Sequence, residues 1–199
     1  MELFKLEVTA KTGKEQLCIN QKPIGYDLLD FWKWSASDLV SNATRGILAE
    51  FIVATALGID LTKPRDEWGS YDLMTPEGVR IEVKCSAFLQ SWAQTSQSSV
   101  IFSIKPARKW NESTHKYSEI IVRDSDVYVF CLLQHINKAT VNPLEIEQWR
   151  FYVVSTKELF RLKGDQKTLT LKALEEITPS VPYHDIREAI TIAMNNGLQ

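Results

Sequence analysis

The stretch YDLMTPEGVRIEVK, residues 71–84, decides the fold. Apolar and charged side chains alternate from Val79 to Lys84, and this alternation has the period of a β-strand with one buried face. Just before it, Pro76 presets φ at the first position of a turn, and Gly78 tolerates the left-handed position that closes it. The stretch therefore predicts a β-hairpin with a three-residue loop.

The length of the loop fixes which residues face each other across the hairpin. A two-residue loop would shift the pairing by one and bring Asp72 opposite Ile81 on the apolar face, so the three-residue loop is preferred. That loop pairs Thr75 with Val79, Met74 with Arg80, Leu73 with Ile81, Asp72 with Glu82 and Tyr71 with Val83.

This register places two carboxylates, those of Asp72 and Glu82, directly opposite each other. Lys84 lies one step further along the same polar face. Opposed like charges destabilise a strand pair. A divalent cation between them would remove the repulsion, because Mg²⁺ takes oxygen ligands from one or two carboxylates. The hairpin thus predicts a site for Mg²⁺ or Mn²⁺.

Asp72, nine intervening residues and then Glu82-Val83-Lys84 resemble the PD-(D/E)xK signature of restriction-endonuclease-like nucleases. Tyr71 stands where that family often has proline. The resemblance implies that Asp72 and Glu82 bind the metal ion, and that Lys84 positions or activates the attacking water. It also implies an α/β fold with an αβββαβ core, a mixed sheet flanked by helices. Residues 82–92 are similar to an uncharacterised bacterial group within that superfamily.

Residues 46–58 are almost entirely apolar, which predicts a helix buried on most sides. Glu50 is the one ionisable residue in this span, and a buried carboxylate is costly unless it is paired or bound to a cation. Two interpretations remain open. Glu50 is either a core glutamate paired with Arg45 or Arg80, or it faces the two hairpin carboxylates. The second is favoured because the resemblance implies a metal-binding glutamate on the helix before the hairpin.

Two groups of polar residues are candidates for contact with DNA. Gln90 and Gln94 have the spacing of one helix face near the active end of the strand, where the resemblance implies a polar group; a solvated helix face is the alternative. Residues 105–123 predict a long irregular connection. Its mixture of basic and aromatic residues suits phosphate contact and base stacking, or else a solvated loop. The basic candidates are Lys105, Arg108, Lys109 and Lys116.

The composition is that of a globular protein with a core, 44% hydrophobic and 24% charged over 199 residues. The net charge is −2, so DNA would have to be attracted by a local basic patch. Cys18, Cys85 and Cys131 are widely spaced, as is typical of small core residues in a reducing cytosol. No apolar run has the length of a signal peptide or a membrane span, so a cytoplasmic protein is expected.

We expect a single nuclease-like domain over residues 1–199, with its core at about 36–133, an N-terminal hairpin at 1–30 and a C-terminal part at 150–199. The aromatic residues at 31–34 should bury against the core, and the alternative is that they lie over a groove. The expected elements are strands at 3–8, 16–19, 99–104, 126–133 and 151–154, a long helix beginning at Ser35 or Ser37, and helices at 169–177 and 184–195.

These features predict a Mg²⁺-dependent endonuclease that hydrolyses phosphodiester bonds in DNA. A homodimer is expected, because cutting both strands of a duplex usually needs two active sites. The alternative is a non-catalytic module on the same fold that binds DNA or another protein. The complete set of Asp72, Glu82 and Lys84 speaks against it, because a decayed site usually loses one member.

Overall fold

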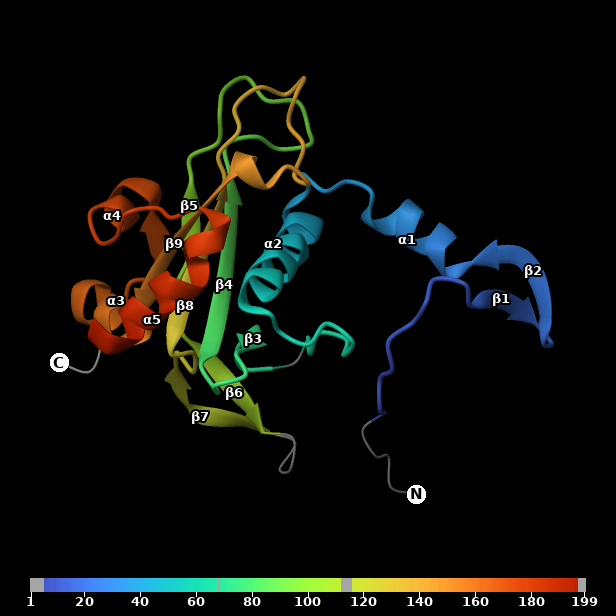
Figure 1. The fold of residues 1–199 in the computed structure, drawn as a ribbon, viewed down its shortest axis with the longest axis horizontal. Helices are drawn as coiled ribbons and strands as arrows, with labels where there is room; N and C mark the ends of the chain where they lie inside the picture. Colours follow the sequence, from blue (N-terminus) through green and yellow to red (C-terminus); the bar gives the residue numbers. More distant parts are fainter. Residues whose placement is uncertain (1–5, 68, 112–115, 197–199) are drawn as a thin grey trace.

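A computed structural model of the chain describes residues 6–67, 69–111 and 116–196, and for 107–111 and 116–122 it describes the backbone alone. A mixed four-stranded sheet lies at its centre, in the order β3-β4-β8-β9 (Figure 1). The pair β4 and β8 is parallel and the other two pairs are antiparallel. These strands are β3 (Leu73–Met74), β4 (Arg80–Ala87), β8 (Val127–Leu133) and β9 (Trp149–Ser155).

Helices and short strands cover both faces of this sheet. One face carries α2 (Asn42–Leu57) and α5 (Ile186–Asn196). The other carries α3 (Thr156–Lys163), α4 (Leu171–Glu175) and a two-stranded sheet of β5 (Ile101–Ser103) with β10 (Thr168–Thr170). Short 3-10 turns at Ile146–Gln148 and Tyr183–Asp185 precede β9 and α5. The predicted mixed α/β architecture with flanking helices is confirmed.

β8 is buried along its whole length and divides the core in two. Its odd-numbered residues, such as Val129, pack with Ile52 of α2 and Ile190 of α5. Its even-numbered residues, such as Phe130, pack with Phe102 of β5 and other residues of the opposite face. Both faces of the strand are therefore apolar, which explains its nearly continuous hydrophobic sequence. The expected central strand at 126–133 is confirmed.

The β3–β4 hairpin has the predicted loop. Leu73 pairs with Ile81, and the N–H of Thr75 donates to the carbonyl of Val79 at 2.9 Å. Gly78 has φ of 87°, the left-handed conformation expected at the end of a three-residue loop. The register is therefore confirmed as far as Leu73.

The N-terminal region differs from the prediction. β1 (Gln16–Ile19) pairs with β2 (Lys22–Asp27), a strand that was not expected, and residues 6–8 form no strand. The helix α1 (Leu28–Ala36) follows directly, so the expected helix start at Ser35 or Ser37 is wrong. Its start is fixed by a capping box in which the N–H of Asp30 donates to Asp27 at 2.9 Å and the N–H of Asp27 donates to Asp30 at 3.2 Å.

The aromatic residues of α1 do not bury against the core, contrary to the prediction: Phe31 is 50% exposed and Trp34 is 85% exposed. Cys18 on β1 is also exposed, whereas Cys131 is fully buried. Burial raises the pKa of Cys131 well above its usual value and that of Cys85 to about 11. Of the three thiols, only Cys85 and Cys131 therefore behave as the core residues that were predicted.

Residues 105–123 are not the irregular connection that was expected. They contain an antiparallel hairpin of β6 (Ala107–Asn111) and β7 (Lys116–Val122). This hairpin lies between β5 and β8, where the expected αβββαβ order has a helix.

In the C-terminal part, β9, α4 and α5 agree with the predicted strand and helices, while α3 and β10 were not predicted. α3 has a single buried residue, Leu159, so its sequence lacks the repeated apolar positions from which an amphipathic helix is predicted. None of the helices in the described ranges combines the length and apolarity that a membrane span needs.

The left-handed glycine of the hairpin loop gives a stability prediction with an internal control. A Cβ added at Gly78 would meet nothing within 4 Å, so Gly78→Ala should cost only backbone strain, about 1 kcal/mol. Gly46 in α2 has equally open surroundings but a helical backbone, so Gly46→Ala should stabilise the protein by about 0.5–1 kcal/mol. Urea denaturation of both variants would measure this, and effects of the same sign would contradict the assigned loop conformation.

Candidate active site

Asp72 occupies the position where the β3–β4 ladder stops. Its backbone N–H donates to the carbonyl of Ile81 at 3.0 Å, and its Oδ2 accepts the N–H of Val83 at 2.7 Å. The predicted pairing of Tyr71 with Val83 is therefore wrong, because the side chain of Asp72 takes the donor that the Tyr71 carbonyl would have used. The two bonds hold the carboxylate against the edge of β4.

Glu82 and Lys84 lie on one face of β4 and form an ion pair between Oε1 and Nζ. Their side chains are only 21% and 28% exposed. Burial raises the pKa of Glu82 above its usual value; the charge of Asp72 adds to the rise, while Lys84 opposes it. Glu82 is opposite Tyr128 of β8, where burial and this carboxylate together raise the pKa of the phenol to about 12. The face is polar and poorly solvated.

Glu50 reaches the same region from α2. Its side chain is 16% exposed, and both of its oxygens accept from Arg65, at 2.9 Å from Nε and 3.1 Å from Nη2. Burial raises the pKa of Glu50 and the charge of Asp72 raises it further, whereas Arg65 and Lys84 lower it. Glu50 is thus close enough to Asp72 and Lys84 to share their electrostatic field.

Both interpretations of Glu50 therefore hold in part. It is paired with an arginine, but with Arg65 in place of the expected Arg45 or Arg80. Arg45 donates to Asn42 Oδ1 at 2.6 Å and to the carbonyl of Val40. Arg80 binds two aspartates at the start of β8, with Nη1 3.0 Å from Asp124 and Nη2 2.7 Å from Asp126.

Arg65 is the site residue that the sequence analysis missed. It lies in the polar link between α2 and β3, fifteen residues after its partner Glu50. No periodicity or turn motif marks it, because the contact depends on how the link folds back over α2. The one available signal was that a lone glutamate in an apolar helix needs a cation, and Arg65 is the arginine nearest to it on the C-terminal side.

The donor set of the site suits a divalent cation bound through few protein ligands. Within the described residues, no three histidine, cysteine or acidic side chains already converge as a metal cage. Asp72 and Glu82 nevertheless interact electrostatically, and Mg²⁺ is usually held by one or two carboxylates with water and substrate phosphate. In this structure each carboxylate has a hydrogen-bond or ion-pair partner within the protein. The N–H of Val83 donates to Asp72, the ammonium of Lys84 pairs with Glu82, and the guanidinium of Arg65 pairs with Glu50.

Gln90 and Gln94 do not lie on a helix, so the predicted helical spacing is wrong. They brace the loop that follows β4: the N–H of Gln90 donates to Gln94 Oε1 at 2.7 Å, and Gln94 Nε2 donates to the carbonyl of Phe88 at 3.2 Å and to Ser98 Oγ at 3.0 Å. Gln90 is only 8% exposed. A contact of either residue with DNA remains a prediction.

The chain leaves the β6–β7 hairpin close to the candidate site. Asp124, two residues after β7, accepts from the hydroxyl of Ser70 at 2.5 Å and from Arg80, so it lies near the base of the β3–β4 hairpin. Arg123 is engaged in the fold, because its guanidinium donates to the carbonyls of Ile104, Gly164 and Gln166. Lys105 is exposed. The side chains of the other basic candidates, Arg108, Lys109 and Lys116, lie outside the described residues.

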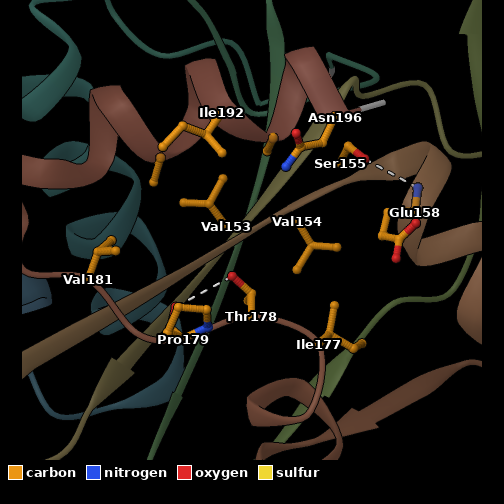
Figure 2. Close-up of a pocket in the computed structure, with 12 residues that line it drawn as sticks. Val153, Val154, Ser155, Glu158, Ile177, Thr178, Pro179, Val181, Ile192 and Asn196 are labelled. Carbon is orange, nitrogen blue, oxygen red and sulfur yellow. Dashed lines mark hydrogen bonds between the residues drawn. The ribbon is translucent and has the colours of Figure 1, made fainter. Parts of the chain in front are cut away.

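An apolar groove lies at the opposite edge of the sheet, between β9, α5 and residues 177–181 (Figure 2). Its volume is about 440 Å³. It is lined largely by side chains such as Val153, Ile192 and Pro179, and among the described residues that line it only Glu158 is ionisable. The groove offers no second carboxylate or lysine, so the candidate chemistry belongs to the β3–β4 edge.

The family model described as "Bacteriophage T4 endonuclease IV" matches residues 21–173. That range includes Glu50, Arg65 and the β3–β4 hairpin. No curated protein matches the chain.

The raised pKa of Glu82 predicts how a neutral substitute behaves. An acid whose folded pKa exceeds its unfolded value, about 4.3 for glutamate, costs stability when ionised. The cost is absent below about pH 4 and fully present above the raised pKa. Glu82→Gln should therefore be at least as stable as the wild type at pH 7, and its advantage should shrink as the pH falls. Chemical denaturation across this pH range would measure the difference.

Glu158 provides the control for this experiment. Its carboxylate, like that of Glu82, is paired with a basic residue, but the hydrogen bonds from two nitrogens of Arg161 lower the pKa of Glu158. Its ionised form therefore stabilises the fold above the ordinary pKa, and this stabilisation is lost as the pH falls. Glu158→Gln should show a small effect of opposite sign. A Glu82→Gln variant that loses stability at pH 7 would contradict the electrostatics assigned to the site.

Proposed function

Because the chain belongs to the bacteriophage T4 endonuclease IV family, we propose that it is a metal-dependent endonuclease that hydrolyses phosphodiester bonds in DNA. We further propose that its active site is of the PD-(D/E)xK type. One observation carries the proposal. Asp72, Glu82 and Lys84 gather at the open edge of β4, and Glu50 on α2 shares their electrostatic field.

Asp72 and Glu82 would hold Mg²⁺ or Mn²⁺, with Glu50 as a further acidic group beside them. When bound, such a cation stabilises charge that develops on the phosphate and lowers the pKa of a bound water. Asp72 is suited to this position because the N–H of Val83 already fixes the orientation of its carboxylate. A ligand that is already oriented loses less entropy when it binds the ion.

Lys84 is the residue we assign to the attacking water. Its ammonium carries three hydrogen-bond donors and no acceptor, and one of them is directed at Glu82. The remaining donors can orient a water molecule and the phosphate oxygen beside it. The low exposure of this ion pair strengthens these interactions, because charges act over a lower effective dielectric away from bulk water.

Arg65 is suited to a role in substrate binding. It is 38% exposed and planar, and it already binds one carboxylate through two parallel hydrogen bonds. The same fork geometry fits a phosphate. We infer that Arg65 neutralises the charge of Glu50 in the free protein and can contact a phosphate of the bound DNA strand. The basic residues of the β6–β7 hairpin would extend this surface along DNA, and two copies of the chain would cut both strands of a duplex.

Cleavage of DNA tests the proposed chemistry directly. With Mg²⁺ or Mn²⁺, the purified protein should cut linear, nicked or branched DNA, and Asp72→Asn or Glu82→Gln should reduce the rate at least about 100-fold, because the lost ligands support several kcal/mol of charge stabilisation. Asp60→Asn, an exposed carboxylate on the link after α2, should leave the rate unchanged. Gel analysis of the products would measure both.

Calorimetry with Mn²⁺ separates metal binding from chemistry. The wild type and Asp60→Asn should bind the ion, and Asp72→Asn should not. Cleavage by Asp72→Asn at the wild-type rate would exclude the site. Binding of DNA without cleavage, together with the absence of Mn²⁺ binding, would favour the non-catalytic alternative.

The contribution of the β6–β7 hairpin can be measured through the salt dependence of DNA binding. Each phosphate contact contributes about 0.9 to the slope of log K against log salt concentration for duplex DNA. Replacing Arg108 and Lys109 with alanine should lower the slope by up to about 2. Replacing Lys167 and Lys172, two exposed lysines of the C-terminal part, should leave it unchanged. An equal slope in all three proteins would remove the hairpin from the DNA-binding surface.

A further inference from the structure

Residues 13–36 form a projecting segment that we call the N-terminal arm. It consists of β1, β2 and α1, and it extends away from the central sheet (Figure 1). Its contacts are mainly internal: the N–H of Leu28 donates to Glu15 and the N–H of Leu29 donates to Gly13, both at 2.9 Å. Within these described residues, only Gly13 is buried. The arm is ordered locally without resting on the core.

The hairpin of the arm is apolar on one face. Leu17 and Ile19 lie on the same side of β1. Because Ile19 pairs with Lys22, Ile24 shares the face of Leu17 and Ile19, together with Lys22 itself. The register shifts beyond this point, where Gly25 has φ of 88° and Tyr26 follows it. All four apolar side chains, those of Leu17, Ile19, Ile24 and Tyr26, are exposed. Their exposed fractions lie between 44% and 63%. A hairpin with one apolar face normally packs that face against another layer.

The helix of the arm adds a second uncovered surface. Phe31 and Trp34 are three residues apart, so they are neighbours on one side of α1, and they are 50% and 85% exposed. Leu29 and Trp32 lie on the side that approaches Gly13, and they too are 45% and 39% exposed. A nine-residue helix and a two-stranded hairpin are each marginal in isolation. The arm therefore needs a partner to bury its side chains.

The size of this surface fits a dimer interface. The arm exposes eight large apolar side chains, whose exposed fractions lie between 39% and 85%. At on the order of 100 Å² each they amount to roughly 600–800 Å², close to the roughly 800 Å² that one partner contributes to a stable complex. The eight are Leu17, Ile19, Ile24, Tyr26, Leu29, Phe31, Trp32 and Trp34.

The charge of the arm favours a second copy of the chain over nucleic acid. Lys14, Lys22 and Lys33 are balanced by Glu15, Asp27 and Asp30, so residues 13–36 carry no net charge. A polyanion is bound through an excess of basic groups, which the arm lacks. Two identical neutral arms do not repel each other, and a twofold axis would use the same residues on both sides.

We propose that the N-terminal arm is the dimerisation element of this protein, with the apolar face of its β1–β2 hairpin at the centre of a twofold contact with the arm of a second copy. The aromatic residues of α1 complete the contact. This assembly is independent of metal and DNA. It would supply two active sites for cutting a duplex, but it does not rest on that chemistry.

Sedimentation of the full chain without metal or DNA tests the proposal. The wild type should be a dimer at micromolar concentration. Ile19→Asp places a charge on the apolar face of the hairpin, and it should weaken association by roughly 30-fold or more, the effect of losing one hot-spot side chain. Trp34→Ala should weaken it as well. Ile136→Asp, on the loop after β8, is the control, because Ile136 is 60% exposed and Ile19 is 63% exposed.

Circular dichroism of the variants would show that they are folded, which is expected because both isoleucines are more than half exposed in the single chain. A wild-type monomer at tens of micromolar would overturn the proposal, as would a dimer in which Ile19→Asp associates as tightly as Ile136→Asp. A protein that dimerises only when DNA is added would overturn it too. None of these results bears on cleavage, so failure of the dimer and failure of the nuclease remain distinguishable.

Discussion

The parallel pairing of β4 with β8 is the constraint on which the rest of the structure depends. Parallel neighbours cannot be joined by a tight turn, and both faces of the sheet they form must be covered. Here seven residue pairs run from Ile81 and Val127 to Ala87 and Leu133. The chain between the strands crosses one face as β5, while α2 and α5 close the other. β4 is therefore rigidly held, except at the edge where β3 ends after two residues.

The candidate site occupies that edge. Because β3 begins only at Leu73, no strand residue pairs with Val83, and its N–H donates to the side chain of Asp72. Each of the three carboxylates is satisfied by a different kind of donor, and two of them still have a pKa above the usual value because burial outweighs their partners. The free protein thus holds negative charge at a position where that charge is unfavourable. This is the electrostatic condition under which binding a cation is favoured.

Local patterns predicted the part of the fold that local physics determines. The Pro76–Gly78 turn fixes the hairpin register, and the apolar run of β8 identifies a strand covered on both faces. Predictions failed where tertiary contacts decide. Gln90 and Gln94 have helical spacing but brace a loop, and Arg65 reaches Glu50 only after the link folds back. The aromatic residues of α1 were expected in the core because apolar composition does not say which surface will cover a side chain.

The burial of Cys85 and Cys131 has a practical consequence for spectroscopy. Their thiols stay protonated and unreactive at neutral pH, whereas Cys18 is exposed on β1. A maleimide dye or nitroxide should therefore attach at one position of the natural sequence. Cys18 points to the face of the hairpin opposite Ile19, because neighbouring residues of a strand alternate. A spin label there would leave the apolar face free and would report interchain distances by pulsed resonance.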